Sequence, residues 1–113
     1  IFEDNHVIVL SKPSGLLSQG EQTGDENLVD WLRKYLGRPY VGLVHRLDRN
    51  TSGLMVVAKR SKSAERLTSA LQAGEIERRY LAWICGNLKE EKSWKHFLRK
   101  DPRTNITRVV KNN

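Results

Sequence analysis

HRLDRNTSG, residues 45–53, is a polar and charged segment that lies between two apolar runs. The runs at residues 41–44 and 54–58 are typical of short strands. We therefore predict a loop that a sheet supports at both ends. Functional side chains are often placed on loops with such rigid supports, so this segment is both the centre of the predicted fold and the candidate site.

Asp48 is the candidate reactive group of this loop, with Arg46 two residues before it and Arg49 directly after it. Nearby guanidinium groups favour the charged form of a carboxylate, and a charged carboxylate can act as a nucleophile. The same arginines supply the positive charge that a phosphate backbone requires. A second interpretation stays open, because residues 48–53 are also good turn formers whose side chains cap backbone amides, and an Asp–Arg pair is often an exposed salt bridge.

Outward from the loop, the chain alternates between strand-like and helix-like stretches. We predict strands over residues 6–10, 41–44, 54–58, 78–85, 94–100 and 106–111. The first of these is a continuous β-branched run, which is typical of a strand covered on both faces. Turn-forming residues follow at 12–15 and 101–103, and a loop is predicted over residues 18–24.

Apolar periodicity predicts two helices. The first would begin with a capping box of Thr23 and Glu26 and end at Gly37, and the second would begin with Ser61 as its cap and end at Gly74. The apolar stripe of the first consists of Leu28, Trp31, Leu32, Tyr35 and Leu36, and that of the second of Ala64, Leu67, Ala70 and Leu71. Because the helices follow isolated strands and the last strands form a hairpin, we predict the α+β class with a mixed, mostly antiparallel sheet.

The charge of the chain favours a nucleic-acid partner. The 113 residues carry a net charge of +7, with a sequence pI of about 9.9, and a basic chain of this size usually binds a polyanion. The length fits one small domain with one core. No apolar run approaches the roughly 20 residues of a membrane span, so no membrane contact is expected.

The single cysteine, Cys85, allows no internal disulfide, which fits a reducing compartment. It lies in an apolar run, so we expect a buried and inert thiol. The three histidines, His6, His45 and His96, have no metal-ligand spacing to one another or to Cys85, so no zinc site is expected.

The loop resembles the signature of the RluA-like family of RNA pseudouridine synthases, in which His-Arg-Leu-Asp is followed by two variable residues and Thr-Ser-Gly. The flanking segments resemble the family in the same order: KPSGL at 12–16, the strand at 54–59, RYLA at 79–82, and Gly86. The resemblance runs from about Phe2 to about Leu88.

This resemblance implies an enzyme that isomerises specific uridines of ribosomal or transfer RNA to pseudouridine. Asp48 matches the essential aspartate, which would act at C6 of the base or at C1′ of the sugar. Arg46 matches an arginine that contacts RNA near the flipped nucleotide, and Tyr80 matches an aromatic residue that packs against the target uracil. Five loop residues would shape the loop rather than react: His45, Leu47, Thr51, Ser52 and Gly53. The resemblance also implies no metal, no organic cofactor, no DNA partner and a cytoplasmic location.

Catalytic domains of this family are considerably longer than 113 residues. The sequence also starts without Met and stops at a predicted strand. We therefore expect residues 1–113 to be the N-terminal portion of a pseudouridine synthase catalytic domain whose C-terminal part is missing. Two alternatives stay open: a truncated, non-catalytic RNA-binding fragment, and a structural fragment whose charge is incidental.

Overall fold

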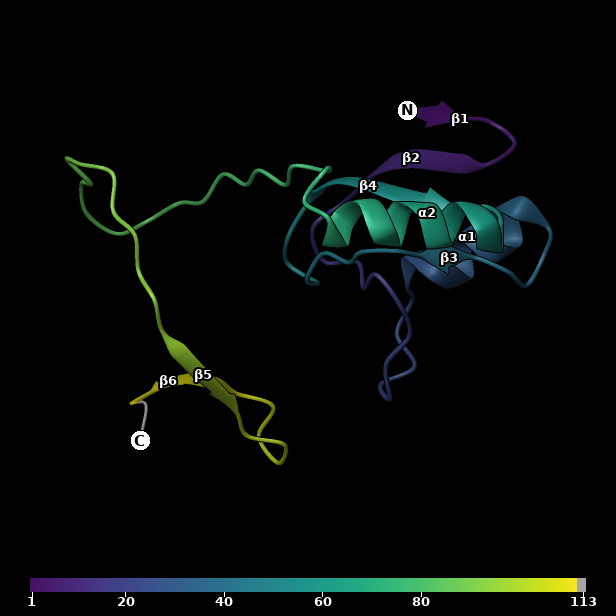
Figure 1. Ribbon diagram of the computed structural model, residues 1–113. Helices are drawn as coiled ribbons and strands as arrows, with labels where there is room; N and C mark the ends of the chain where they lie inside the picture. The colour runs from purple at the N-terminus through teal and green to yellow at the C-terminus, as the bar shows by residue number, and fades with distance from the viewer. Residues whose placement is uncertain (112–113) are drawn as a thin grey trace. The chain divides into compact units, whose positions relative to one another are not determined.

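The computed structural model describes residues 1–111, and the chain divides into two compact units, Ile1–Arg79 and Tyr80–Asn113. The first unit contains a four-stranded sheet and two helices, and the second contains a two-stranded hairpin (Figure 1). Every pair of neighbouring strands in both sheets is antiparallel. The predicted α+β class with a mostly antiparallel sheet is therefore confirmed.

The sheet of the first unit has the order β1-β2-β4-β3. Its strands are β1 (Phe2–Glu3), β2 (Val7–Lys12), β4 (Gly53–Ala58) and β3 (Gly42–Leu43). In the register of the two central strands, Val7 lies opposite Ala58 and Lys12 lies opposite Gly53. The strands predicted at residues 6–10, 41–44 and 54–58 are thus confirmed. The end of β2 meets the end of the loop 45–53, which brings the turn at 12–15 beside that loop.

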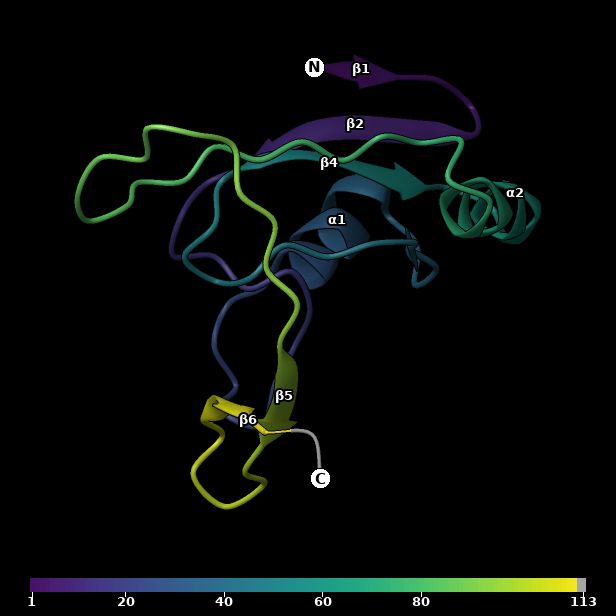
Figure 2. The ribbon, with the colours of Figure 1, turned by 60° about the vertical axis from the view of Figure 1, so that its left-hand side comes forward.

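Helix α1 (Leu28–Leu36) lies against one face of the sheet (Figure 2), and the core of the first unit lies between them. Side chains alternate between the two faces of a strand, so Ile8 of β2 and Met55 of β4 share the face that α1 covers. The buried residues of this core are Ile8, Leu28, Leu32, Leu47, Met55 and Val57. On the opposite face of β2, Val7 and Val9 are only half-buried within this unit.

The start of α1 differs from the prediction. The cap is Asn27, whose Oδ1 accepts the N–H of Asp30 at 3.0 Å, and the predicted capping box of Thr23 and Glu26 is wrong. The reason is a tertiary contact: the N–H of Leu28 donates to the carbonyl of Leu17 at 2.8 Å, which fixes the backbone where the helix begins. Gly37 ends α1 with a φ of +63°, as predicted.

The predicted apolar stripe of α1 is only partly buried. Leu28 and Leu32 face the core, while Trp31 and Tyr35 are more than half exposed. Their rings stack on each other instead, with centroids 5.3 Å apart and planes 7° apart. Val29, which the stripe did not include, is buried.

Helix α2 (Ser61–Gln72) packs against β3 and β4. Ala64 on its apolar face lies so close to Gly42 that a Cβ on that glycine would be 3.0 Å from the Ala64 Cβ. Ser61 is the first helical residue and not the cap; the cap position is Arg60, which makes no side-chain capping bond. Gly74 follows the helix with a φ of +73°, as predicted.

The second unit contains the hairpin of β5 (Phe97–Lys100) and β6 (Thr107–Val110), which confirms the two last predicted strands in shortened form. The turn between them is built on Asp101, whose Oδ1 accepts the N–H of Arg103 at 2.8 Å. The strand predicted over 78–85 is wrong, because no strand among residues 1–111 pairs with that segment. The expected burial of Cys85 is also wrong, since this irregular segment leaves the thiol exposed.

Within residues 1–111, no helix is long and apolar enough to cross a membrane. The same residues include no group of three or more His, Cys, Asp or Glu side chains that could hold a metal ion.

Candidate active site

The loop between β3 and β4 presents its charged residues and buries its apolar one. Leu47 is 6% exposed and belongs to the core, whereas its neighbours Arg46 and Asp48 are exposed. The N–H of Thr51 donates to the carbonyl of Asp48 at 3.0 Å, so Asp48 is the first residue of a hydrogen-bonded turn. The buried leucine therefore anchors the loop and leaves the carboxylate beside it on the surface.

Ser18 holds the backbone at Leu47 from inside the unit. Its buried hydroxyl donates to the Leu47 carbonyl at 2.5 Å and lies 3.1 Å from the Leu47 N–H, which donates back to it. Both polar groups of this buried residue are thus satisfied by one side chain from 29 positions away in the sequence.

Lys12 is a fully buried lysine beneath the same loop. It lies on the inward face of β2, two residues after Leu10, so its side chain runs into the core before its amine reaches the loop backbone. Its Nζ donates to the carbonyl oxygens of Pro13 at 3.1 Å, Leu16 at 2.6 Å and Arg49 at 3.2 Å. Burial lowers the pKa of Lys12, and the negative charge of Asp48 opposes that lowering.

The turn after β2 binds the loop directly. Gly15 and Arg49 exchange two bonds: the Gly15 N–H donates to the Arg49 carbonyl at 2.7 Å, and Arg49 Nε donates to the Gly15 carbonyl at 3.2 Å. Ser14 Oγ donates to the carbonyl of Asn50 at 2.8 Å. Gly15 has a φ of +93°, a conformation that glycine adopts without steric cost.

The loop is also tied to the sheet at its two ends. Before Asp48, His45 Nε2 accepts the N–H of Val56 at 3.1 Å. After it, Gly53 begins β4 with a φ of +145°, and a Cβ there would lie 3.7 Å from Leu47 Cδ1. His45, Leu47 and Gly53 thus shape the loop as predicted. The hydroxyls of Thr51 and Ser52 make no hydrogen bond to residues 1–111, so the interpretation of these two side chains as caps of backbone amides is wrong for that range.

The charged groups of the loop do not neutralise one another. Arg49 pairs with Asp25 at 2.9 Å, and neither Arg46 nor Arg49 forms an ion pair with Asp48. In the part of the chain that the structure describes, the Asp48 carboxylate accepts no hydrogen bond. The interpretation of Asp48 as a salt-bridge or amide-capping residue is therefore wrong for residues 1–111. Its oxygens are open to a ligand, and the loop backbone beneath them is held.

The third predicted site residue, Tyr80, belongs to the second unit. It lies in an irregular segment and is 61% exposed. The structure thus brings Arg46 and Asp48 together on one loop, with Tyr80 in the other unit.

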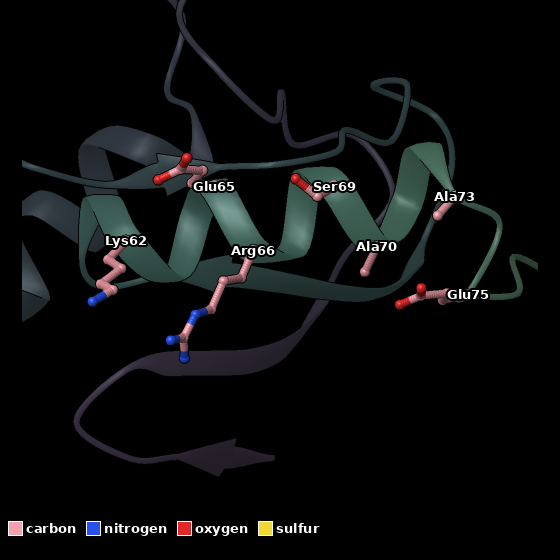
Figure 3. Close-up of a pocket in the computed structure, with 7 residues that line it drawn as sticks. All are labelled: Lys62, Glu65, Arg66, Ser69, Ala70, Ala73 and Glu75. Atoms are coloured by element: carbon pink, nitrogen blue, oxygen red, sulfur yellow. The ribbon is translucent and has the colours of Figure 1, made fainter.

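A shallow hollow on α2 is not part of this site. Figure 3 shows that the side chains around it come from one side of the helix and from the turn that follows. They are Lys62, Glu65, Arg66, Ser69, Ala70, Ala73 and Glu75. Their mixture of short, basic and acidic side chains presents no group that the loop chemistry requires.

Three comparisons with known proteins identify the family of this chain. The family described as RNA pseudouridylate synthase matches residues 6–113, which is most of the chain. The chain belongs to the RNA pseudouridylate synthase family. It is 43% identical over 93 residues to the ribosomal large subunit pseudouridine synthase D of Yersinia pestis, covering 78% of this chain and 29% of the relative.

Two further relatives extend the comparison. The chain is 36% identical over 91 residues to the dual-specificity RNA pseudouridine synthase RluA of Vibrio parahaemolyticus, covering 80% of this chain and 36% of that protein. A solved structure of human RNA pseudouridylate synthase domain containing 4 superimposes with a TM-score of 0.52 at 27% identity, covering 66% of this chain and 29% of the human one. The chain thus spans about a third of the length of these family members.

Proposed function

We propose that this chain is the aspartate-bearing part of an RNA pseudouridine synthase, with Asp48 as the catalytic residue. The proposal rests on one observation: within residues 1–111 the Asp48 carboxylate is free, whereas the backbone that carries it is held in place. The Asp48 carboxylate is exposed and accepts no hydrogen bond from residues 1–111, while the backbone around it is held by Lys12, Ser14 and Ser18. A reacting group needs this combination of free lone pairs and fixed position.

The reaction begins with Asp48 acting as a nucleophile at C6 of the uracil or at C1′ of its ribose. The N1–C1′ bond then breaks, the base rotates, and C5 forms a bond to C1′. The bond from Asp48 to C6 or C1′ breaks by the end of the reaction and restores the free carboxylate. C5 loses its proton to water, and N1, which carries no proton in uridine, gains one. Substrate and product are isomers, so this scheme balances without an oxidant, a reductant or a second substrate.

Arg46 and Tyr80 would act on the bound nucleotide. Arg46 is exposed two residues before Asp48 and has no ion-pair partner in the described range, so its guanidinium is available to a phosphate. Tyr80 is exposed, and an aromatic ring of this kind can stack on a base that has left its helix.

RNA is the proposed partner because the chain carries a net charge of +7 and its relatives are named as RNA enzymes. One relative is named for the large ribosomal subunit, so ribosomal RNA is the first substrate to test, and transfer RNA is the second. We infer a cytoplasmic location for an enzyme that acts on these RNAs.

Release of tritium tests the proposal. RNA labelled with tritium at C5 of uridine, prepared from cells that lack the enzyme, is incubated with the protein, and label transferred to water is counted. Asp48→Asn should abolish release while changing RNA affinity little. Glu65→Gln on α2 is the control, because it removes the same charge outside the loop and should release label as the unaltered chain does.

Retained release in Asp48→Asn would overturn the catalytic assignment. RNA binding without release by the unaltered chain would favour the alternative function of a non-catalytic RNA-binding fragment. RNA affinity that does not fall between about 50 and 200 mM salt would count against both functions, because phosphate contacts make binding steeply salt-dependent.

A further inference from the structure

His45 occupies a place where the sheet lacks a strand. Strand β3 pairs only with the last two residues of β4, and it ends at Leu43, opposite Val57. The part of β4 from Gly53 to Val56 therefore has no β3 residue opposite it. The N–H of Val56 therefore faces a position that β3 no longer fills. The imidazole of His45 fills it, and its Nε2 accepts that N–H at 3.1 Å.

This bond fixes the protonation state of the imidazole. A backbone N–H can only donate, so Nε2 must carry a lone pair, and the proton of the neutral ring then lies on Nδ1. A second proton would sit on Nε2, so that two N–H groups would point at each other across the same distance. Protonation and the bond to Val56 therefore exclude each other.

We propose that His45 is a positioning residue that holds the Asp48 loop against β4 only while its imidazole is neutral, so that acid releases this tie. The release of the loop from β4 follows from the hydrogen bond between Val56 and His45 alone. Its consequence for catalysis rests on the function proposed above. The closing experiment therefore separates the two.

The surroundings of His45 favour the neutral ring. Burial lowers its pKa from the ordinary value of 6.5, and the positive charge of Arg78 lowers it further. Among residues 1–111, β4 adds no charged side chain in contact with the ring, Arg46 next in the chain is exposed, and Lys12 interacts with Asp48. The hydrogen bond from Val56 to His45 is therefore present at neutral pH, and it is lost only when the pH falls below the ordinary histidine pKa of 6.5.

The tie acts mainly on the residue between two anchors. His45 is bound to β4, and Leu47 is bound to Ser18, so Arg46 lies on a short segment with one anchor on each side. Loss of the His45 anchor frees Arg46, while Leu47 and the turn at Asp48 keep their own bonds. In an active enzyme, opening should therefore raise KM for RNA by a larger factor than it lowers kcat.

Amide hydrogen exchange of Val56, measured by NMR between about pH 5 and pH 8, tests the proposal. Protection, taken relative to the intrinsic exchange rate, should fall about tenfold in the unaltered chain as the pH is lowered through this range, the size of effect that loss of one hydrogen bond produces. His45→Gln keeps an acceptor at the same position but cannot be protonated, so protection should stay high throughout. His45→Ala should show low protection at every pH.

Val57 serves as the internal reference, because it is paired with Ile8 in the central register and should stay protected in all three proteins. The proposal would be overturned if the protection of the Val56 amide in the unaltered chain did not change with pH. It would also be overturned if His45→Gln lost this protection in acid. Both results are independent of activity, so they stand even if the tritium assay fails. In an active protein, a KM for RNA that rises in acid for the unaltered chain but not for His45→Gln would support the role in catalysis.

Discussion

The hydroxyl of Ser18 is bonded to both backbone groups of Leu47, the residue directly before Asp48. The two segments are 29 positions apart, and Ser18 itself is 4% exposed. The loop is therefore held from the inside of the unit at the position next to its exposed carboxylate. Residues that never touch a substrate can in this way decide where Asp48 lies.

Ser18→Ala should destabilise the first unit and weaken catalysis together. The substitution leaves a buried N–H and a buried carbonyl of Leu47 without a partner, which costs about 1–3 kcal/mol of unfolding free energy. Chemical denaturation measures this loss. Ser14→Ala is the matched control, because it removes one exposed bond, to the carbonyl of Asn50, and should cost well under about 1 kcal/mol. Equal losses in both variants would contradict the anchoring role of Ser18.

Lys12→Met should be more damaging than a lysine substitution normally is. It keeps the aliphatic stem but removes the donor from three carbonyl oxygens and the positive charge beneath Asp48. We expect a loss of roughly 3 kcal/mol in unfolding free energy, because the part-buried carbonyls of Pro13 and Leu16 lose their donor and the Arg49 carbonyl keeps only the Gly15 N–H. Lys62→Met on the exposed side of α2 should change stability by less than about 0.5 kcal/mol. Denaturation of both variants checks the difference, and a tolerated Lys12→Met would show that the amine is dispensable.

Glu3 should make the stability of the first unit sensitive to acid. Its carboxylate accepts bonds from Lys59 at 2.5 Å and from the Tyr35 hydroxyl at 2.9 Å, and these two bonds lower its pKa below the ordinary 4.5. A carboxyl whose folded pKa is depressed stabilises the protein above its unfolded pKa, and this contribution disappears as the pH falls through the folded value.

Thermal unfolding at about pH 7 and about pH 3 measures this contribution. Glu3→Gln should show a smaller difference in Tm between the two conditions than the unaltered chain. Glu65→Gln, which removes a carboxylate that has no ion pair among the residues described, should leave the difference as it is. An unchanged difference in Glu3→Gln would mean that the contacts of Glu3 do not persist in solution.

The parts of the fold that depend on local chemistry could be predicted from the sequence. The apolar runs before and after residues 45–53 form β3 and β4 because their neighbours in the sheet are also apolar runs. Gly37 and Gly74 end their helices with positive φ values, a conformation that few other residues adopt without cost. Asp48 could be singled out because its loop carries a specific motif.

The parts that depend on distant contacts could not be predicted. A lysine normally lies on the surface, so nothing in the sequence indicates that Lys12 is buried, apart from its place two residues after Leu10 on the inward face of a strand. Ser18 carries no signal, because its partner is 29 positions away. The cap of α1 is Asn27 and not Thr23 because of a distant contact, the bond between Leu28 and Leu17. Residues 78–85 have a strand-like composition but form no strand, because a strand also needs a neighbouring backbone to pair with.

Gly42→Ala tests the packing of α2 on the edge of the sheet. A Cβ at this position would lie 2.9 Å from the Cβ of Ala58 and 3.0 Å from its carbonyl oxygen, and 3.0 Å from the Cβ of Ala64. These distances are shorter than ordinary contacts, so β3 or α2 must shift, and overpacking of this kind costs about 1–3 kcal/mol. Because Gly42 lacks a positive φ, the cost is one of space and not of backbone conformation.

The control for this prediction is Gly20→Ala, where the added Cβ would meet only the side-chain amide of Asn27 at 3.4 Å. We expect its unfolding free energy to change by less than about 0.5 kcal/mol. Combining Gly42→Ala with Ala64→Gly removes one of the two opposing Cβ atoms and should recover part of the loss, apart from the cost of a glycine in the helix. If Gly42→Ala were as stable as Gly20→Ala in denaturant, α2 would not pack against β3 as closely as described, and the sheet edge beside the loop would be free of the helix.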